Sequence, residues 1–206
     1  MNTVQGYLLI VEDDPDILRL LETTLTFKGY RVFTARNGYE GLEAVQKVHP
    51  VLVVADIMMP KLDGFGLVNR LRIDPDTREI PVVFITATYV EPEDREFAQN
   101  IGVAGFIQKP IDLEEFLATI RELLEQGASV AHEPLKDFEF YDGYRKRLEA
   151  KLGQKSAQIA REERLLGGIL SDEERHAIQV SLSDAIKERD EIRLLLEQIH
   201  EQIKKY

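Results

Sequence analysis

The sequence predicts an α/β fold, with a doubly wound five-stranded parallel sheet followed by an all-α segment. Up to about residue 126, five short apolar runs alternate with five amphipathic stretches, which is typical of strands and helices in turn. Three of the runs, at 7–11, 51–55 and 82–85, are almost wholly apolar. Strands of that kind are buried on both faces, as a parallel sheet with helices on either side requires.

The strands and helices follow from periodicity and from the signals at their ends. Strands are expected at 7–11, 32–34, 51–55, 82–85 and 105–107, and helices at about 15–27, 38–48, 64–73, 91–100 and 112–125. Asp14 before Pro15 is a typical N-cap with proline in the first helical turn. Asp63-Gly64 is interpreted as a turn that starts the third helix.

After Gly127 the pattern changes. Residues 127–137, GASVAHEPLKD, are expected to be a linker, and residues 138–206 to form two long charged helices. Gly167-Gly168 interrupts them. Ser171 followed by Glu174 predicts a capping box at the start of the second helix. Residues 127–206 are called the tail below.

The second helix of the tail has an apolar row at alternating spacings of four and three, which is typical of a heptad seam. The row consists of Ile178, Leu182, Ala185, Ile192, Leu196, Ile199 and Ile203. Only Arg189 interrupts it. The first helix is less regular. The tail is therefore expected to be a helical hairpin or a coiled coil, and the sequence leaves open whether the contact lies within one chain or between two.

Composition narrows the function classes. The net charge of −11 argues against a general nucleic-acid binder, and the absence of cysteine excludes disulfides and thiolate metal sites. There is no signal peptide and no apolar run of about 18 residues, so a cytoplasmic protein that does not span a membrane is expected. The tail has 14 Lys and Arg against 16 Asp and Glu, and its basic stretch 145–147 is short for a DNA-reading surface.

Polar side chains follow four of the five expected strands. Glu12-Asp13-Asp14 follow the first, Asp56 the third, Thr86 the fourth and Lys109-Pro110 the fifth. In an open parallel sheet these ends meet at the edge where ligands bind. Carboxylates without histidine or cysteine suit Mg²⁺. A cation, a lysine and a hydroxyl around one carboxylate would suit phosphoryl transfer, with Asp56 as the nucleophile.

Four stretches, LLIVEDDPDIL, VVADIMMPKLDGFGL, VVFITAT and GFIQKP, together resemble the motifs of the receiver domain of two-component response regulators. The match covers roughly residues 6–126 in the family's order and spacing. The resemblance implies a flavodoxin-like fold. It also implies that a sensor histidine kinase or phosphotransfer protein donates a phosphoryl group to the aspartate that ends the third strand.

On this resemblance Asp56 would be the phosphoacceptor. Asp13 would bind Mg²⁺ directly, Glu12 largely through water, and Met58 through its backbone carbonyl. Asp14 would then be left as the helix N-cap.

The resemblance also assigns roles beyond the acids. Thr86 would bond one phosphoryl oxygen and Lys109 another, and the Lys109-Pro110 peptide would be cis. Phe106 stands where the family has its switch aromatic. The expected organisation is a receiver domain at 1–126, a linker at 127–137, and an output or dimerisation module at 138–206.

The predicted function is that of a response regulator rather than an enzyme. Phosphorylation of Asp56 would change the receiver surface and so control dimerisation or partner binding through the tail, with no nucleic acid or membrane expected as partner. Two alternatives stay open. The chain could carry a signalling helix of a longer protein with a cyclase-type or kinase-type output, or, less favoured, it could regulate DNA. Phosphotransfer through His176 or His200 is a weaker interpretation, since neither lies in a kinase-like motif.

Overall fold

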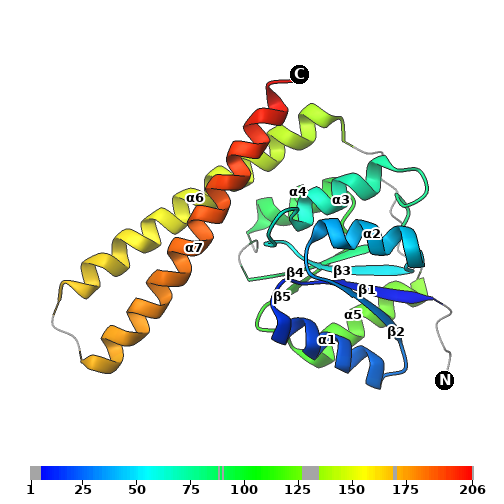
Figure 1. Cartoon of the computed structure of the whole chain (residues 1–206), viewed down its shortest axis with the longest axis horizontal. Helices are drawn as coiled ribbons and strands as arrows, with labels where there is room; N and C mark the ends of the chain where they lie inside the picture. Colours follow the sequence, from blue (N-terminus) through cyan, green and yellow to red (C-terminus); the bar gives the residue numbers. More distant parts are fainter. Residues whose placement is uncertain (1–5, 88, 90, 127–134, 169–170, 206) are drawn as a thin grey trace. The chain divides into compact units, whose positions relative to one another are not determined.

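The structure is a computed structural model of the 206-residue chain, and it describes residues 6–87, 89, 91–126, 135–168 and 171–205 (Figure 1). The chain divides into two compact units, 1–135 and 136–206.

The first unit is built on five parallel strands in the order β2-β1-β3-β4-β5. The strands are β1 (Tyr7–Val11), β2 (Arg31–Ala35), β3 (Leu52–Asp56), β4 (Val82–Thr86) and β5 (Gly105–Gln108). All five expected strands are confirmed, with ends that differ by one residue at most. Asp56 and Thr86 are the last residues of their strands rather than the first residues after them.

Helices cover both faces of this sheet, so the predicted fold class is confirmed. They are α1 (Pro15–Phe27), α2 (Gly38–Val48), α3 (Gly64–Ile73), α4 (Pro92–Asn100) and α5 (Leu113–Gln126). Helices α1 and α5 lie on one face and α2, α3 and α4 on the other (Figure 1). Every residue of β3 and β4 is buried, as strands covered on both sides must be.

The helix ends follow from capping. The carboxylate of Asp14 accepts hydrogen bonds from the amides of Asp16 and Ile17, and Asp63 caps α3 through the amide of Gly66. The predicted cap at Asp14 and the predicted helix start at Asp63-Gly64 are both confirmed. Helix α5 begins one residue later than expected because Asp112 caps it, accepting from the amides of the second and third residues that follow.

A buried arginine connects the two loops that lead into β4 and β5. The guanidinium of Arg72 donates to the carbonyls of Arg78 (2.9 Å), Ile80 (3.0 Å) and Gly102 (2.7 Å). Burial lowers the pKa of Arg72 to about 10, so the side chain stays protonated at neutral pH. Its three bonds fix the segments that lead into β4 and β5.

The second unit is a pair of long helices, α6 (Asp137–Leu166) and α7 (Asp172–Ile203). The capping box of Ser171 and Glu174 is confirmed. Most of the predicted linker lies outside the described residues. The last residue of the predicted linker, Asp137, already belongs to α6, which begins one residue before the predicted boundary.

The two helices run antiparallel as a hairpin. Lys155 contacts Glu188 at 2.7 Å, and the hydroxyl of Ser181 donates to Glu162 at 2.9 Å, so residues later in α6 meet residues earlier in α7. The buried side chains of α7 are all members of the predicted seam, namely Ala185, Ile192, Leu196 and Ile199. The apolar row is therefore used within the chain. Arg189, which interrupts it, pairs with Asp190 at 2.8 Å.

Within the described residues, no helix combines the length and the apolar character needed to cross a membrane.

One glycine in α6 is a test of helix stability. Gly153 lies inside the helix, and a Cβ added there would meet nothing within 4 Å. Because glycine is unfavourable in a helix interior, Gly153→Ala is expected to raise the free energy of opening α6 by about 0.5–1 kcal/mol. Hydrogen exchange of α6 amides measures this directly.

The control is Gly29→Ala, because Gly29 has a φ of +89° in the left-handed region. That substitution is expected to lower the free energy of unfolding of the first unit instead. Faster exchange of α6 amides in Gly153→Ala would contradict the open space around Gly153.

Candidate functional site

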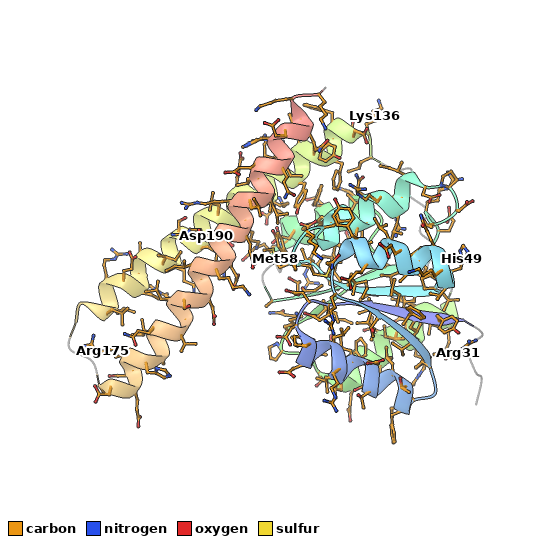
Figure 2. All side chains as sticks on the ribbon, viewed as in Figure 1. Arg31, His49, Met58, Lys136, Arg175 and Asp190 are labelled. Atoms are coloured by element: carbon orange, nitrogen blue, oxygen red, sulfur yellow. The ribbon has the colours of Figure 1, made fainter. Side chains whose placement is uncertain are left out.

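The four polar strand ends that the sequence singles out meet at one edge of the sheet. Glu12, Asp56, Thr86 and Lys109 each lie at or just after the carboxyl end of β1, β3, β4 and β5. Figure 2 labels Met58 at this edge, and Arg31 and His49 at the opposite one. Parallel strands bring these ends together because every strand finishes on the same side of the sheet.

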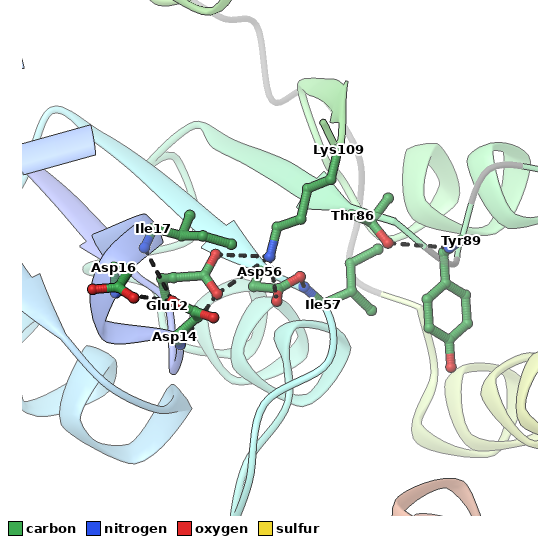
Figure 3. Close-up of polar contacts among 9 residues, drawn as sticks. All are labelled: Glu12, Asp14, Asp16, Ile17, Asp56, Ile57, Thr86, Tyr89 and Lys109. Carbon is green, nitrogen blue, oxygen red and sulfur yellow. Dashed lines mark hydrogen bonds and ion pairs between the residues drawn. The ribbon is translucent and has the colours of Figure 1, made fainter. Parts of the chain in front are cut away.

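Lys109 lies between two carboxylates. Its ammonium is 2.9 Å from Oδ2 of Asp56 and 3.0 Å from Oε2 of Glu12 (Figure 3). Burial alone would lower the pKa of Lys109, but Asp56 and Glu12 outweigh it, and the net shift is upward. The lysine is therefore a fixed positive charge at the centre of the site. The peptide from Lys109 to Pro110 is cis, as the resemblance implies.

Asp56 is held by two donors. The Ile57 amide donates to Oδ1 at 2.7 Å, while Lys109 donates to Oδ2 (Figure 3). The residue is only 8% exposed. Burial raises the pKa of Asp56, Lys109 and the Ile57 amide partly offset this, and the nearby Asp13 adds to the rise.

Glu12 is almost completely buried, with 1% of its surface exposed. Burial raises its pKa to about 7, repulsion from Asp56 adds to the rise, and Lys109 opposes it. One ammonium thus does not fully compensate the carboxylates gathered around it. A further positive charge would stabilise their ionised forms.

The acids can hold such a charge. Glu12, Asp13 and Asp56 each offer a carboxylate oxygen, and these oxygens lie within 4.8 Å of one another. Oxygen ligands of this kind fit a hard divalent cation such as Mg²⁺. Asp14 is not part of the group, because its side chain caps α1.

The remaining predicted residues lie around these acids. Met58 is half-buried, two residues beyond Asp56. Thr86 is buried, and its hydroxyl oxygen accepts a hydrogen bond from the amide of Tyr89 at 3.1 Å (Figure 3). Phe106 is half-buried on β5, with its ring edge-on to that of Phe84 at a centroid distance of 5.7 Å.

Gly64 has a role in the site that sequence reasoning missed. A Cβ on Gly64 would lie 2.6 Å from the carbonyl oxygen of Asp56 and 2.9 Å from Cα of Ile57. Only glycine therefore allows α3 to begin against the backbone of the phosphoacceptor candidate. Aspartate followed by glycine gave a signal for a turn, but the steric requirement depends on which segment the turn packs against.

Residues 8–121 match the family model for the response regulator receiver domain, which is more than half of the chain. The protein therefore belongs to the response regulator receiver family. Curated relatives that carry this domain are named as transcriptional regulators.

Three relatives illustrate the likeness. A protein from Pyropia yezoensis, described as "Probable transcriptional regulator ycf27", is 42% identical over 130 residues, which cover 63% of this chain and 52% of the relative. The DNA-binding dual master transcriptional regulator RpaA of Synechocystis is 38% identical over 119 residues, which cover 58% of this chain and 49% of the relative. The chemotaxis response regulator CheY4 of Vibrio cholerae is 30% identical with a TM-score of 0.54, covering 57% and 98%.

The chain spans about half the length of the curated relatives that it matches, such as the Pyropia yezoensis protein and RpaA. The likeness therefore supports the assignment of the receiver domain and says nothing about the output of the tail.

The N-cap Asp63 gives the domain a pH dependence separate from the acidic site. Asp63 is 2% exposed, and its Oδ2 meets no hydrogen-bond donor among the described residues. Burial raises its pKa to about 7, although the amide of Gly66 favours the ionised form. Ionisation of the buried Asp63 lowers the free energy of unfolding. Its full value is therefore present below the ordinary carboxyl pKa, and stability is lost as pH rises from there through about 7.

We expect Asp63→Asn to keep the cap while removing the charge. The free energy of unfolding should rise by about 1–3 kcal/mol at pH 8 and by less at pH 5, where only part of the stability has been lost. Urea denaturation at the two pH values measures the difference. The exposed cap Asp112→Asn is the control, and a gain for Asp63→Asn that is equal at both pH values would contradict the assignment.

Proposed function

We propose that this protein is a response regulator in which Asp56 accepts a phosphoryl group from a phosphohistidine. The observation that carries the proposal is the Lys109 ammonium, held 2.9 Å from Asp56 and 3.0 Å from Glu12 at the carboxyl edge of the sheet. This arrangement provides a carboxylate nucleophile beside a fixed cation, which is what phosphoryl transfer to a carboxylate requires.

The side chains of the site would divide the work. A carboxylate oxygen of Asp56 attacks phosphorus, and the phosphorus–nitrogen bond of the donor imidazole breaks. Lys109 and the hydroxyl of Thr86 bond the oxygens of the transferred group. The Ile57 amide, 2.7 Å from Asp56 Oδ1, holds the carboxylate in place.

Glu12, Asp13, Asp56 and the Met58 carbonyl would hold Mg²⁺. When bound, the ion supplies positive charge against the oxygens of the phosphoryl group. The raised pKa values of Glu12 and Asp56 support this assignment, since an added cation favours the ionised form of each.

Thr86 would turn the chemistry into a change of surface. In the unphosphorylated state its hydroxyl is engaged by the amide of Tyr89. A phosphoryl group on Asp56 would compete for this hydroxyl, and the movement of Thr86 would leave space into which Phe106 can turn. Phosphorylation would then shift the population between two states of the receiver surface.

The tail would supply the output through protein contacts, as a dimeriser or as a docking module for another protein. Two helices joined as a hairpin bury one seam and leave their outer faces to solvent, so a second hairpin can complete a four-helix bundle. Large apolar side chains on these helices are exposed at Phe138, Leu165, Val180 and Leu194. These exposed side chains support association with a second copy.

DNA regulation is the second candidate, because relatives such as RpaA are named as DNA-binding transcriptional regulators. That activity belongs to those proteins. For this chain the described residues after Leu135 form two helices, with charges of both signs over 136–205. We therefore place protein association first.

Phosphorylation of Asp56 can be measured by intact mass. Incubation of the full chain with Mg²⁺ and phosphoramidate, a small phosphodonor, is expected to add one phosphoryl group. Asp56→Asn should remove the addition, because an amide oxygen cannot replace the carboxylate as nucleophile. Asp14→Asn is the matched control and should be phosphorylated normally, since its side chain only caps α1. Equal labelling of Asp56→Asn would refute Asp56 as the acceptor.

Light scattering tests the tail. We expect the full chain to be a dimer and a chain ending at Gln126 to be a monomer, both in Mg²⁺ without a phosphoryl mimic. Beryllofluoride, which mimics an acyl phosphate, is then added to each. Dimerisation that appears only with beryllofluoride and survives truncation would assign the switch in assembly to the receiver. A full chain that stays monomeric would exclude the homodimer and favour a different protein as partner.

A further inference from the structure

A row of aromatic rings connects the backbone at Asp56 with the edge strand β5. Gly64 packs against the Asp56 carbonyl, and a Cβ on Gly64 would also lie 3.1 Å from Cε1 of Phe84. The Phe84 ring is in turn edge-on to Phe106, at 5.7 Å between centroids. The two phenylalanines are direct partners in the register of β4 and β5. The contacts therefore run without a break from the phosphoacceptor candidate to Phe106.

Thr86 belongs to the same layer of side chains. It lies two residues beyond Phe84 on β4, and residues two apart on a strand project from the same face. Any displacement of Thr86 toward Asp56 changes the space beside Phe84 and Phe106. The position of the Phe106 ring is thus linked by packing to whether Thr86 is bonded to the Tyr89 amide.

Arg95 covers the end of this row. Its guanidinium, on α4, lies 5.2 Å from the centroid of the Phe106 ring. A guanidinium at this distance from an aromatic face is attracted by the ring quadrupole. β5 is the outer strand of the sheet, so no further strand fixes the ring on that side. Arg95 thus stabilises one position of Phe106.

We propose that Arg95 is a positioning residue that holds Phe106 in its unphosphorylated place and so sets the resting balance of the switch. The inference rests on the proposed function. Because the guanidinium–ring contact exists only where the ring lies under Arg95, movement of Phe106 away from it breaks the contact. Arg95 then favours the unphosphorylated state, and its loss makes the phosphorylated state easier to reach.

The first unit contains a matched control. Arg70 on α3 stacks on Tyr39 of α2, with its guanidinium 5.4 Å from the ring centroid. Arg70→Gln removes the same charge and an equivalent contact without touching the row of Phe84 and Phe106. This variant therefore measures how much the loss of one positive charge alone changes the affinity for an anion.

The experiment is the apparent affinity of the full chain for beryllofluoride in Mg²⁺, followed by NMR. We expect Arg95→Gln to bind about two- to fivefold more tightly than the unsubstituted protein, the factor that corresponds to an exposed cation–π contact. Arg95→Lys should stay close to the unsubstituted protein, since an ammonium can also lie over the ring. Arg70→Gln should not tighten binding.

A double-variant cycle isolates the contact with Phe106. In a Phe106→Leu background, Arg95→Gln should no longer tighten binding, because there is no ring to release. Persistence of the gain in that background would overturn the proposal. So would an Arg95→Gln affinity no tighter than that of Arg70→Gln.

The two levels of inference fail in different ways. If the unsubstituted protein does not bind beryllofluoride at all, the proposed function is wrong. If it binds and Arg95→Gln gives no gain, only the role of Arg95 is wrong. Thermal unfolding of each variant confirms that the compared proteins are folded.

Discussion

The salt bridge of Lys109 with Asp56 and Glu12 is the interaction on which the site depends. Three ionisable groups are removed from water at the carboxyl edge of the sheet, and each is tolerable only because the others are there. The ammonium does not balance them fully, since burial still raises the pKa of both carboxyl groups. That imbalance suits the proposed binding of a cation and of a phosphoryl group at this site.

The parallel sheet is what makes this cluster possible. β1, β3 and β5 are not consecutive in the chain, yet all three end at the same edge of the sheet because crossover helices return the chain to the same starting edge. Burial on both faces gives the strands their apolar character and leaves their ends as the places for polar side chains. The same constraint brings Gly64 against Asp56, where no larger residue fits.

Much of this was predictable from local patterns. Apolar runs located all five strands, and the caps at Asp14 and Ser171 followed from residue type and spacing. Predicting that Asp56 and Lys109 lie at one edge required only that the strands be parallel. Periodicity could not show that Lys109 contacts two carboxylates at once, or that Asp63 is buried. It also could not decide that the α7 seam pairs within the chain, because an apolar row does not specify the helix that covers it.

The three bonds from Arg72 have a mechanical consequence for α4. Gly102, whose carbonyl accepts one of them, lies just beyond the C-terminal end of this nine-residue helix. This bond fixes the C-terminal end of α4, and the helix extends about 13 Å away from that end. A tilt of α4 about this fixed end would displace its first turn the most, around Glu93 and Asp94, and would leave the loop at Gly102 in place.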